Sequence, residues 1–295
     1  MNGILVIDKP CGFTSHDVVN RVRRILGQRS VGHLGTLDPS ATGVLPIVLG
    51  NLTRLAQFYA HSEKTYEGTI RFGFATDTYD ADGQATTPPQ EIRLDLEAVR
   101  ALARQFQGVI QQLPPPFSAK KVAGVPAYKL ARKKKEVELQ PVQIEIKEFE
   151  ILDVSADHAT FRAHVTSGTY IRSIAHDMGS QLGCGAHLAC LRRTSVAEFA
   201  VADAHTLEAL QTAAQQGTVE PLCVHPRKLV PELPSVTATE ENVALIRSGR
   251  AVNLPEMSRA PQVKVFFGQR DLIAIATRIA GTLFHAGIVF SAFDN

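Results

Sequence analysis

The chain has 295 residues, 44% of them hydrophobic and 20% charged, and its formal net charge is +2. This balance is typical of a globular protein with a substantial core, and the length suggests about two domains. So small a net charge does not by itself indicate a nucleic-acid partner, so any such partner must be inferred from local clusters of charge.

The sequence shows no signal peptide and no apolar run long enough to cross a bilayer, which favours a cytoplasmic protein without membrane attachment. None of the four cysteines belongs to a Cys-x-x-Cys pair. Cys184, His187 and Cys190 follow one another in steps of three, but no fourth ligand lies nearby. Core packing therefore explains them better than a zinc site, and we expect no metal.

The first expected elements are a strand, a turn and a helix. Residues 3–7 form an apolar run that ends at Asp8-Lys9-Pro10-Cys11-Gly12, which predicts a strand followed by a turn. Thr14 or Ser15 can cap the next helix, one face of which carries Val18, Val19, Val22, Ile25 and Leu26.

Residues 31–50 contain one carboxylate, Asp38, among Gly32, Gly35, Pro39 and Gly43. Glycine relaxes the backbone and proline extends the residue before it, so Asp38 is expected on a shaped loop. Residues 44–49 after it resemble a buried strand, with Pro46 at an edge or bulge. Local chemistry leaves two interpretations open: a presented functional group, or an Asx-turn in which the carboxylate bonds its own backbone.

The middle of the chain predicts a short helix over residues 53–60 and then a strand. Tyr66, Gly68, Ile70, Phe72 and Phe74 alternate along residues 64–74 and so share one face of that strand. The acidic, turn-rich segment at 75–83 lacks the final glutamate of a calcium-binding loop. Asp95 can cap a helix that Gly108 ends.

The densest basic stretch follows the extended triple proline at 114–116. It carries Phe117 and Tyr128 between its cations, which include Lys129, Arg132, Lys133 and Lys134. Charge with interleaved aromatics is typical of an arm that grips phosphates, and a solvated helix face is the alternative.

Two alternating strands and a helix come next. Residues 142–151 change phase near Lys147, which predicts a bulge, and residues 159–165 form the neighbouring strand. The helix after Tyr170 has a core face of Ile171, Ile174, Ala175, Met178 and Leu182. Arg172 lies at its first turn, where a cation opposes the helix dipole, so an anionic partner is expected.

The last third predicts a strand over residues 195–199 and a helix over 206–216. Prolines then crowd residues 221–234, which suggests a linker. Beyond it, residues 235–295 predict a small β-rich module with a helix at 240–246 and strands at 263–267, 272–277 and 283–290.

Four separated stretches resemble one known family, in its order and spacing. They are Asp8-Lys9-Pro10 with Gly12 and Thr14-Ser15; Gly32-His33 with Gly35-Thr36-Leu37-Asp38-Pro39 and residues 41–45; Lys64-x-Tyr66 with residues 76–83; and Gly168-Thr169-Tyr170-Ile171-Arg172-Ser173 with Leu191-Arg192-Arg193-Thr194. From near residue 3 to about residue 200, the chain resembles bacterial TruB-type tRNA pseudouridine-55 synthases. The C-terminal piece resembles the family's PUA-like RNA-binding domain only in size, position and strand content.

The resemblance implies an α+β pseudouridine-synthase fold: a mixed, largely antiparallel sheet with flanking helices. It implies a catalytic domain over residues 1–228, with a basic insertion at about 118–139, and a PUA-like domain over 235–295. It also implies that uridine-55 of the tRNA T-loop is flipped out and isomerised to pseudouridine without a cofactor. The expected partner is the T-arm of tRNA, and a monomer without an obligate protein partner is expected.

Site residues follow from the same resemblance. It implies that Asp38 is the catalytic carboxylate, that Tyr66 stacks near the target base, and that Arg172 pairs with the carboxylate. It assigns the remaining contacts to four residues: His33 holds the nucleotide, Tyr170 and Leu191 line the uracil pocket, and Asp80 belongs to the same network. Whether Asp38 attacks C1′ or C6, or deprotonates C2′, is left open.

Two departures and three rival functions accompany the resemblance. Ser167 stands where many relatives carry lysine, and Leu52-Thr53-Arg54 replaces Ala-Thr-Lys. Rivals are a non-catalytic tRNA chaperone, a guide-RNA-dependent synthase, and carboxylate-based nucleobase exchange. The intact set of Asp38, Tyr66 and Arg172 argues against a chaperone without catalysis. The basic insertion argues against a guide-RNA-dependent synthase, and the lack of a visible site for a donor base argues against nucleobase exchange.

Overall fold

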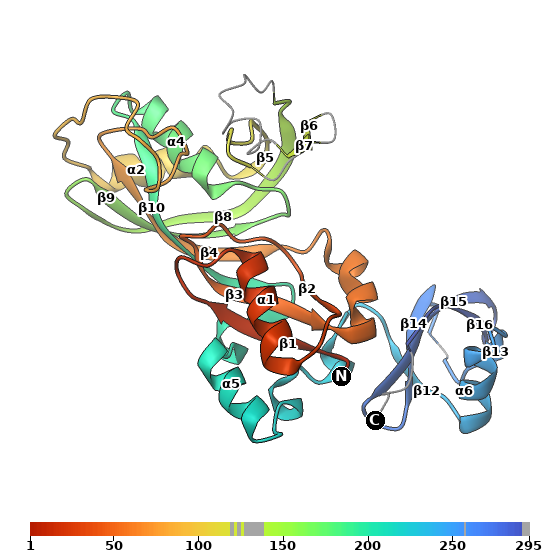
Figure 1. Ribbon diagram of the computed structural model, residues 1–295. Coiled ribbons are helices and arrows are strands. Elements are labelled where there is room, and N and C mark those ends of the chain that lie inside the picture. The colour runs from red at the N-terminus through yellow and green to blue at the C-terminus, as the bar shows by residue number, and fades with distance from the viewer. Residues whose placement is uncertain (119–120, 123–124, 127–138, 257, 291–295) are drawn as a thin grey trace.

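The computed structural model describes all residues except 119–120, 123–124, 127–138, 257 and 291–295 (Figure 1). Much of the basic insertion, including Lys129, Arg132, Lys133 and Lys134, therefore lies outside the described residues. The predicted phosphate-gripping arm stays a prediction.

One large sheet organises the first three quarters of the described chain. Its main path runs β1 (Gly3–Lys9), β3 (Thr42–Leu49), β10 (Ala186–Val196), β4 (Lys64–Phe72), β9 (His158–Val165), β8 (Val142–Ser155) and β5 (Gly108–Gln112). Two short strands attach at its side, β2 (Val31–His33) on β3 and β11 (Phe199–Ala200) on β10. Among the described strands of this sheet, every neighbouring pair is antiparallel except β3 with β10, so the predicted mixed, largely antiparallel sheet is confirmed.

Helices cover two separate regions of this sheet. Near β1 and β3, α1 (Ser15–Leu26) and α5 (Leu207–Gln215) enclose a core that includes Val18, Val22, Leu45 and Leu210. Around β4, β8 and β9, α2 (Leu96–Arg104) and α4 (Ile171–Gln181) enclose a second core. Figure 1 shows the two pairs of helices at opposite ends of the sheet. The loop that carries Asp38 follows β2.

Local signals placed most of these elements correctly. Thr14 caps α1 in a reciprocal capping box with Asp17, and Asp95 and Thr206 cap α2 and α5. The expected bulge appears as a register shift between Ile146 and Glu148. The short helix predicted at 53–60 is present as a 3-10 helix, η1 (Gly50–Tyr59).

Two sequence expectations about the bounds of elements were wrong. The strand predicted only at residues 195–199 begins much earlier, because β10 covers Ala186–Val196 and two register shifts against β4 interrupt its alternation. Leu182, predicted in the core face of α4, is 41% exposed because it follows the helix end.

Pro46 lies in an interior strand, where the sequence suggested an edge or a bulge. On one side β3 pairs with β1 throughout its length. On the other side its partner changes, from β10 at Thr42–Gly43 to β2 at Ile47–Leu49. Pro46 falls in the gap between those two pairings, so the missing amide hydrogen removes no ladder bond there.

The C-terminal part forms a second, five-stranded sheet in the order β12 (Ser235–Thr237), β14 (Gln262–Phe267), β15 (Asp271–Ala280), β16 (Leu283–Val289) and β13 (Val252–Asn253). Together with α6 (Glu240–Arg247) it encloses its own hydrophobic core. This confirms a β-rich C-terminal domain.

The connection between the two parts is ordered rather than loose. Leu229 and Val230 are fully buried in a core shared with Phe266 and Phe290. Lys264 of β14 reaches back and donates to the carbonyl oxygen of Leu229 at 2.6 Å. The proline-rich segment therefore attaches the C-terminal sheet to the large sheet.

Candidate active site

Side chains of the N-terminal strand β1 and helix α1 bind the backbone of the loop that carries Asp38. Lys9, at the end of β1, is fully buried and donates from Nζ to the carbonyl oxygens of Pro10, Phe13 and Pro39 at 3.0, 2.6 and 3.0 Å. The hydroxyl of Ser15, at the start of α1, accepts the amide hydrogen of Leu37 at 2.8 Å. These bonds fix the backbone on both sides of Asp38.

A second buried cation, Arg193 of β10, fixes the other end of the loop. Its side chain donates to the carbonyl oxygens of Gly35, Thr36 and Val44 at 3.0, 3.2 and 2.8 Å. Arg193 is 0% exposed, and within the described residues no carboxylate pairs with it. Burial lowers its pKa from the usual value. Arginine tolerates this environment because its guanidinium stays charged while several carbonyls satisfy its donors.

Asp38 and Arg172 form a two-pronged ion pair. Arg172 Nε lies 2.9 Å from Asp38 Oδ2, and Nη2 donates to Oδ1 at 3.2 Å. The arginine side chain is 6% exposed, whereas that of Asp38 is 39% exposed. The pair therefore fixes the direction of the carboxylate while leaving it accessible from the cleft.

The remaining donors of Arg172 bind the neighbouring loops. Nη1 donates to the carbonyl oxygen of Thr78 at 3.0 Å and lies 3.4 Å from Asp80 Oδ2, and Nη2 donates to the carbonyl oxygen of Phe117 at 3.1 Å. Burial raises the pKa of Asp80, while the Thr78 hydroxyl bonds its carboxylate at 2.5 Å. Asp80 and Asp38 thus contact the same guanidinium.

A cleft of about 290 Å³ opens above the Asp38 carboxylate. Its lining includes Tyr66, Tyr170 and Leu191, together with Asp38 and Arg172, from four separate parts of the chain. Burial raises the pKa of both tyrosine hydroxyls, so both rings are neutral phenols near pH 7. This volume is at the lower end of the range for small-ligand sites, and the walls combine aromatic surface with one carboxylate.

Two predicted site residues, His33 and Asp80, do not line the cleft; Asp80 contacts Arg172 behind the cleft wall, whereas His33 lies on β2. His33 ends this strand, five residues before Asp38. Burial lowers its pKa, and its Nδ1 has no hydrogen-bond partner within the described residues.

Sequence reasoning missed three cations at this site. Lys9, Arg193 and Lys64 all stood in the quoted motifs, but motif position alone gave them no role. Lys64 lines the cleft, while the other two lie beneath the loop. Arg193 lies in β10 beside Arg192 and Thr194, so its local sequence gives little signal of a buried clamp; Lys9, which follows the apolar run at residues 3–7, gives a clearer one.

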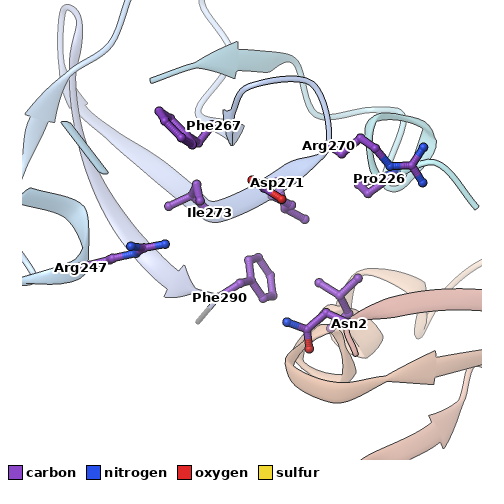
Figure 2. Close-up of a pocket in the computed structure, with 10 residues that line it drawn as sticks. Asn2, Pro226, Arg247, Phe267, Arg270, Asp271, Ile273 and Phe290 are labelled. Carbon is purple, nitrogen blue, oxygen red and sulfur yellow. The ribbon is translucent and has the colours of Figure 1, made fainter. Parts of the chain in front are cut away.

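A second cavity lies where the two sheets meet. Asn2, Leu52, Phe267, Arg270 and Phe290 are among its lining residues, and Figure 2 shows Asn2 on one part of the chain facing Phe290 on the other. It contains none of the residues of the Asp38 site. Among the described residues, no three His, Cys, Asp or Glu side chains are grouped to hold a metal, and no helix is long and apolar enough to cross a membrane.

The fold and this cleft define a class of protein, the RNA-modifying enzymes of the pseudouridine-synthase fold. An archaeal box H/ACA Nop10–Cbf5 complex contains a chain with 26% identity and a TM-score of 0.68, and the match covers 99% of this chain and 87% of that one. A Cbf5–Nop10–Gar1 complex gives 25% identity and a TM-score of 0.71, with 99% and 86% covered.

The family models match in two consecutive parts. Residues 23–171 match the N-terminal domain of the TruB family pseudouridylate synthases, and residues 172–225 match the tRNA pseudouridylate synthase B C-terminal domain. A tRNA pseudouridine synthase B of Solibacter usitatus is 47% identical over 98% of this chain and 100% of its own length. That of Geobacter sulfurreducens is 43% identical, with 84% and 82% covered. The chain belongs to the TruB family of pseudouridylate synthases.

Proposed function

We propose that this protein isomerises uridine-55 in the T-loop of tRNA to pseudouridine. The two-pronged pair of Arg172 and Asp38 in an aromatic cleft carries the proposal, because it supplies one directed carboxylate to a flat base. Relatives called tRNA pseudouridine synthase B, at 38–47% identity, supply the substrate class. The reaction breaks N1–C1′ and joins C5 to C1′, so no atom is lost and no electron is exchanged.

In this proposal Asp38 is the catalytic group, as nucleophile or as base. Arg172 fixes the direction of this carboxylate by placing two donors on it, at 2.9 and 3.2 Å, while the cleft side stays open to a substrate. Asp80 helps to hold the guanidinium in place from the far side.

Tyr66 receives the face of the flipped base, and its neutral phenol is a candidate to relay the C5 proton, accepting it as the hydroxyl passes its own proton on. The residue is 7% exposed and lines the cleft. Flipping a base costs a few kcal/mol of unstacking, and aromatic surface in the cleft recovers part of it. Tyr170 and Leu191 complete the pocket around the uracil. His33 lies outside the cleft wall, so we assign it a supporting role in holding the nucleotide.

Regions away from the cleft complete the proposal. We assign residues 1–228 to catalysis and 235–295 to RNA binding by a PUA-like domain, with the basic insertion, including Lys129, Arg132, Lys133 and Lys134, gripping the tRNA backbone. The enzyme acts as a cytoplasmic monomer without cofactor or obligate protein partner. Light scattering of the purified protein, alone and with tRNA, tests the monomer, and a stable dimer would contradict it.

Chemical mapping of pseudouridine in a tRNA transcript incubated with the purified protein tests the reaction. We expect one modified position, in the T-loop, and none when that uridine is replaced by cytidine. Pseudouridine confined to another arm, or none at all, would overturn the proposed substrate. Tight binding of the transcript without product would favour the tRNA chaperone instead.

A further inference from the structure

Lys64 projects into the candidate active site from the first position of β4. It lies two residues before Tyr66, so both side chains share one face of the strand, and both line the cleft. Its Nζ donates to the carbonyl oxygen of Ser62 at 2.6 Å, and no other partner is found within the described part of the chain. Because an ammonium has three N–H groups, two remain available.

The other cations of the site are either already bound or away from the cleft. Arg172, which also lines the cleft, directs its side chain at two carboxylates and two carbonyl oxygens. Lys9 satisfies its three N–H groups with three carbonyl oxygens beneath the loop. Arg193 donates to three carbonyl oxygens and does not line the cleft. Of the described cations that line the cleft, Lys64 is therefore the one able to bind an incoming anion.

The charge on Lys64 is uncompensated before a ligand enters. Burial lowers its pKa to about 8, and the neighbouring positive charge of Arg193 acts in the same direction. Within the described residues, Lys64 forms no ion pair with a carboxylate, although Asp38 lines the same cleft. An anion on the nucleotide backbone would relieve both the burial and the repulsion.

We propose that Lys64 binds a phosphate that flanks the target uridine and so holds the flipped nucleotide against Tyr66. The inference rests on the proposed function, because a uridine drawn into the cleft brings its adjoining phosphates with it. Lys64 is then a substrate-binding residue, and its loss should weaken the capture of RNA without changing the chemical step.

A double-mutant cycle across the interface tests this contact. Single-turnover rates are measured against enzyme concentration with a synthetic T-arm stem-loop, which separates half-saturation from maximal rate. The RNA carries either natural phosphates or one neutral methylphosphonate, placed on the 5′ or the 3′ side of the target uridine. The proteins are wild type, Lys64→Met, Lys64→Arg and, as a control outside the cleft, Lys228→Met.

We expect Lys64→Met to raise the half-saturation concentration about tenfold, the loss typical of one charged hydrogen bond, with the maximal rate within about twofold. Lys64→Arg should restore most of the affinity, and Lys228→Met should match wild type. A methylphosphonate at the contacted phosphate should raise the half-saturation concentration of wild type by a similar factor. The same RNA should not change the half-saturation concentration of Lys64→Met.

Three results would overturn the role of Lys64. In the first, Lys64→Met and the methylphosphonate weaken binding additively, whichever side of the uridine carries the methylphosphonate. In the second, Lys64→Met has the wild-type half-saturation concentration, and in the third, it has a lower maximal rate at saturating enzyme. If wild type forms no pseudouridine in the unmodified stem-loop or in full tRNA, the proposed function itself fails, which is a separate outcome.

Discussion

Arg172 and Asp38 are 134 residues apart in sequence and meet side by side, with Nε 2.9 Å from Oδ2 and Nη2 3.2 Å from Oδ1. This parallel arrangement uses the planar fork of arginine and fixes both oxygens of the carboxylate. The same guanidinium holds Thr78 and Phe117 by their carbonyl oxygens. One side chain therefore directs the reacting group and joins the loops around it.

Asp38→Asn should abolish turnover while the protein still folds and binds tRNA. Asp38 is the one carboxylate among the described residues that line the cleft, so no neighbour can replace it. We expect a loss on the order of ten-thousandfold or more, measured as tritium release from tRNA labelled at C5 of uridine. Asp203→Asn, at an exposed position, is the control. Release by Asp38→Asn at the wild-type rate would end the assignment.

Arg172→Lys tests whether the fork, rather than the positive charge, is required. One ammonium cannot reproduce both bonds to Asp38 and also satisfy Asp80 and two carbonyl oxygens. We expect maximal turnover to fall about a hundredfold or more, with the dissociation constant for tRNA within about threefold. A weaker affinity with normal maximal turnover would instead indicate a phosphate contact.

Gly43→Ala should destabilise the fold through a backbone collision beside the site. Gly43 has φ +99°, and a Cβ there would lie 2.2 Å from the carbonyl oxygen of Arg193. Gly108 is the matched control, because its φ is +93° and a Cβ would meet nothing within 4 Å. We expect Gly108→Ala to cost about 1–2 kcal/mol from strain alone. Gly43→Ala should cost more than about 3 kcal/mol, since overpacking is added.

Urea unfolding of the two glycine variants decides between these effects. Failure of Gly43→Ala to accumulate in soluble form, when Gly108→Ala does, would agree with the larger cost. Equal costs would show that the strands β3 and β10 separate easily and that close backbone contact there is dispensable.

Asp177→Asn should stabilise the protein near pH 7. Burial raises the pKa of this carboxyl on α4 to about 6 from the usual 3.8. The folded state thus binds the proton more tightly than the unfolded state, so the free energy of unfolding falls as pH rises from about 4 to 6. A pKa difference of about 2 corresponds to about 3 kcal/mol at most, and solvent screening of this half-buried group reduces our expectation to about 1 kcal/mol.

Thermal unfolding at two pH values checks this sign. Asp177→Asn should unfold a few degrees above wild type at pH 7.5, and its advantage should shrink towards pH 4.5 as the wild-type carboxyl is protonated. A lower unfolding temperature at pH 7.5 would mean that the ionised carboxylate stabilises the fold.

Elements with a strong local period were predictable residue by residue. The capping box of Thr14 and Asp17, the alternation through Tyr66 and the bulge after Ile146 are all set by neighbours in sequence. The strand β10 was not, because two register shifts break its alternation and because it carries the fully buried Arg193. Because charged residues are usually exposed, a strand with a buried arginine is not recognised as a core strand from its sequence.

The sequence by itself determined the family and its chemistry, since the motifs around Asp38, Tyr66 and Arg172 are present in the order and spacing of the family. It also indicated that Arg172 needs an anion, because a cation at a helix start is unfavourable. Only the tertiary structure decided that Lys9 and Arg193 clamp the Asp38 loop, that His33 lies outside the cleft, and that Lys64 retains free donors. The physical reason is that a polar group's role depends on which partners the sheet order brings within about 3 Å, and no local period encodes that order.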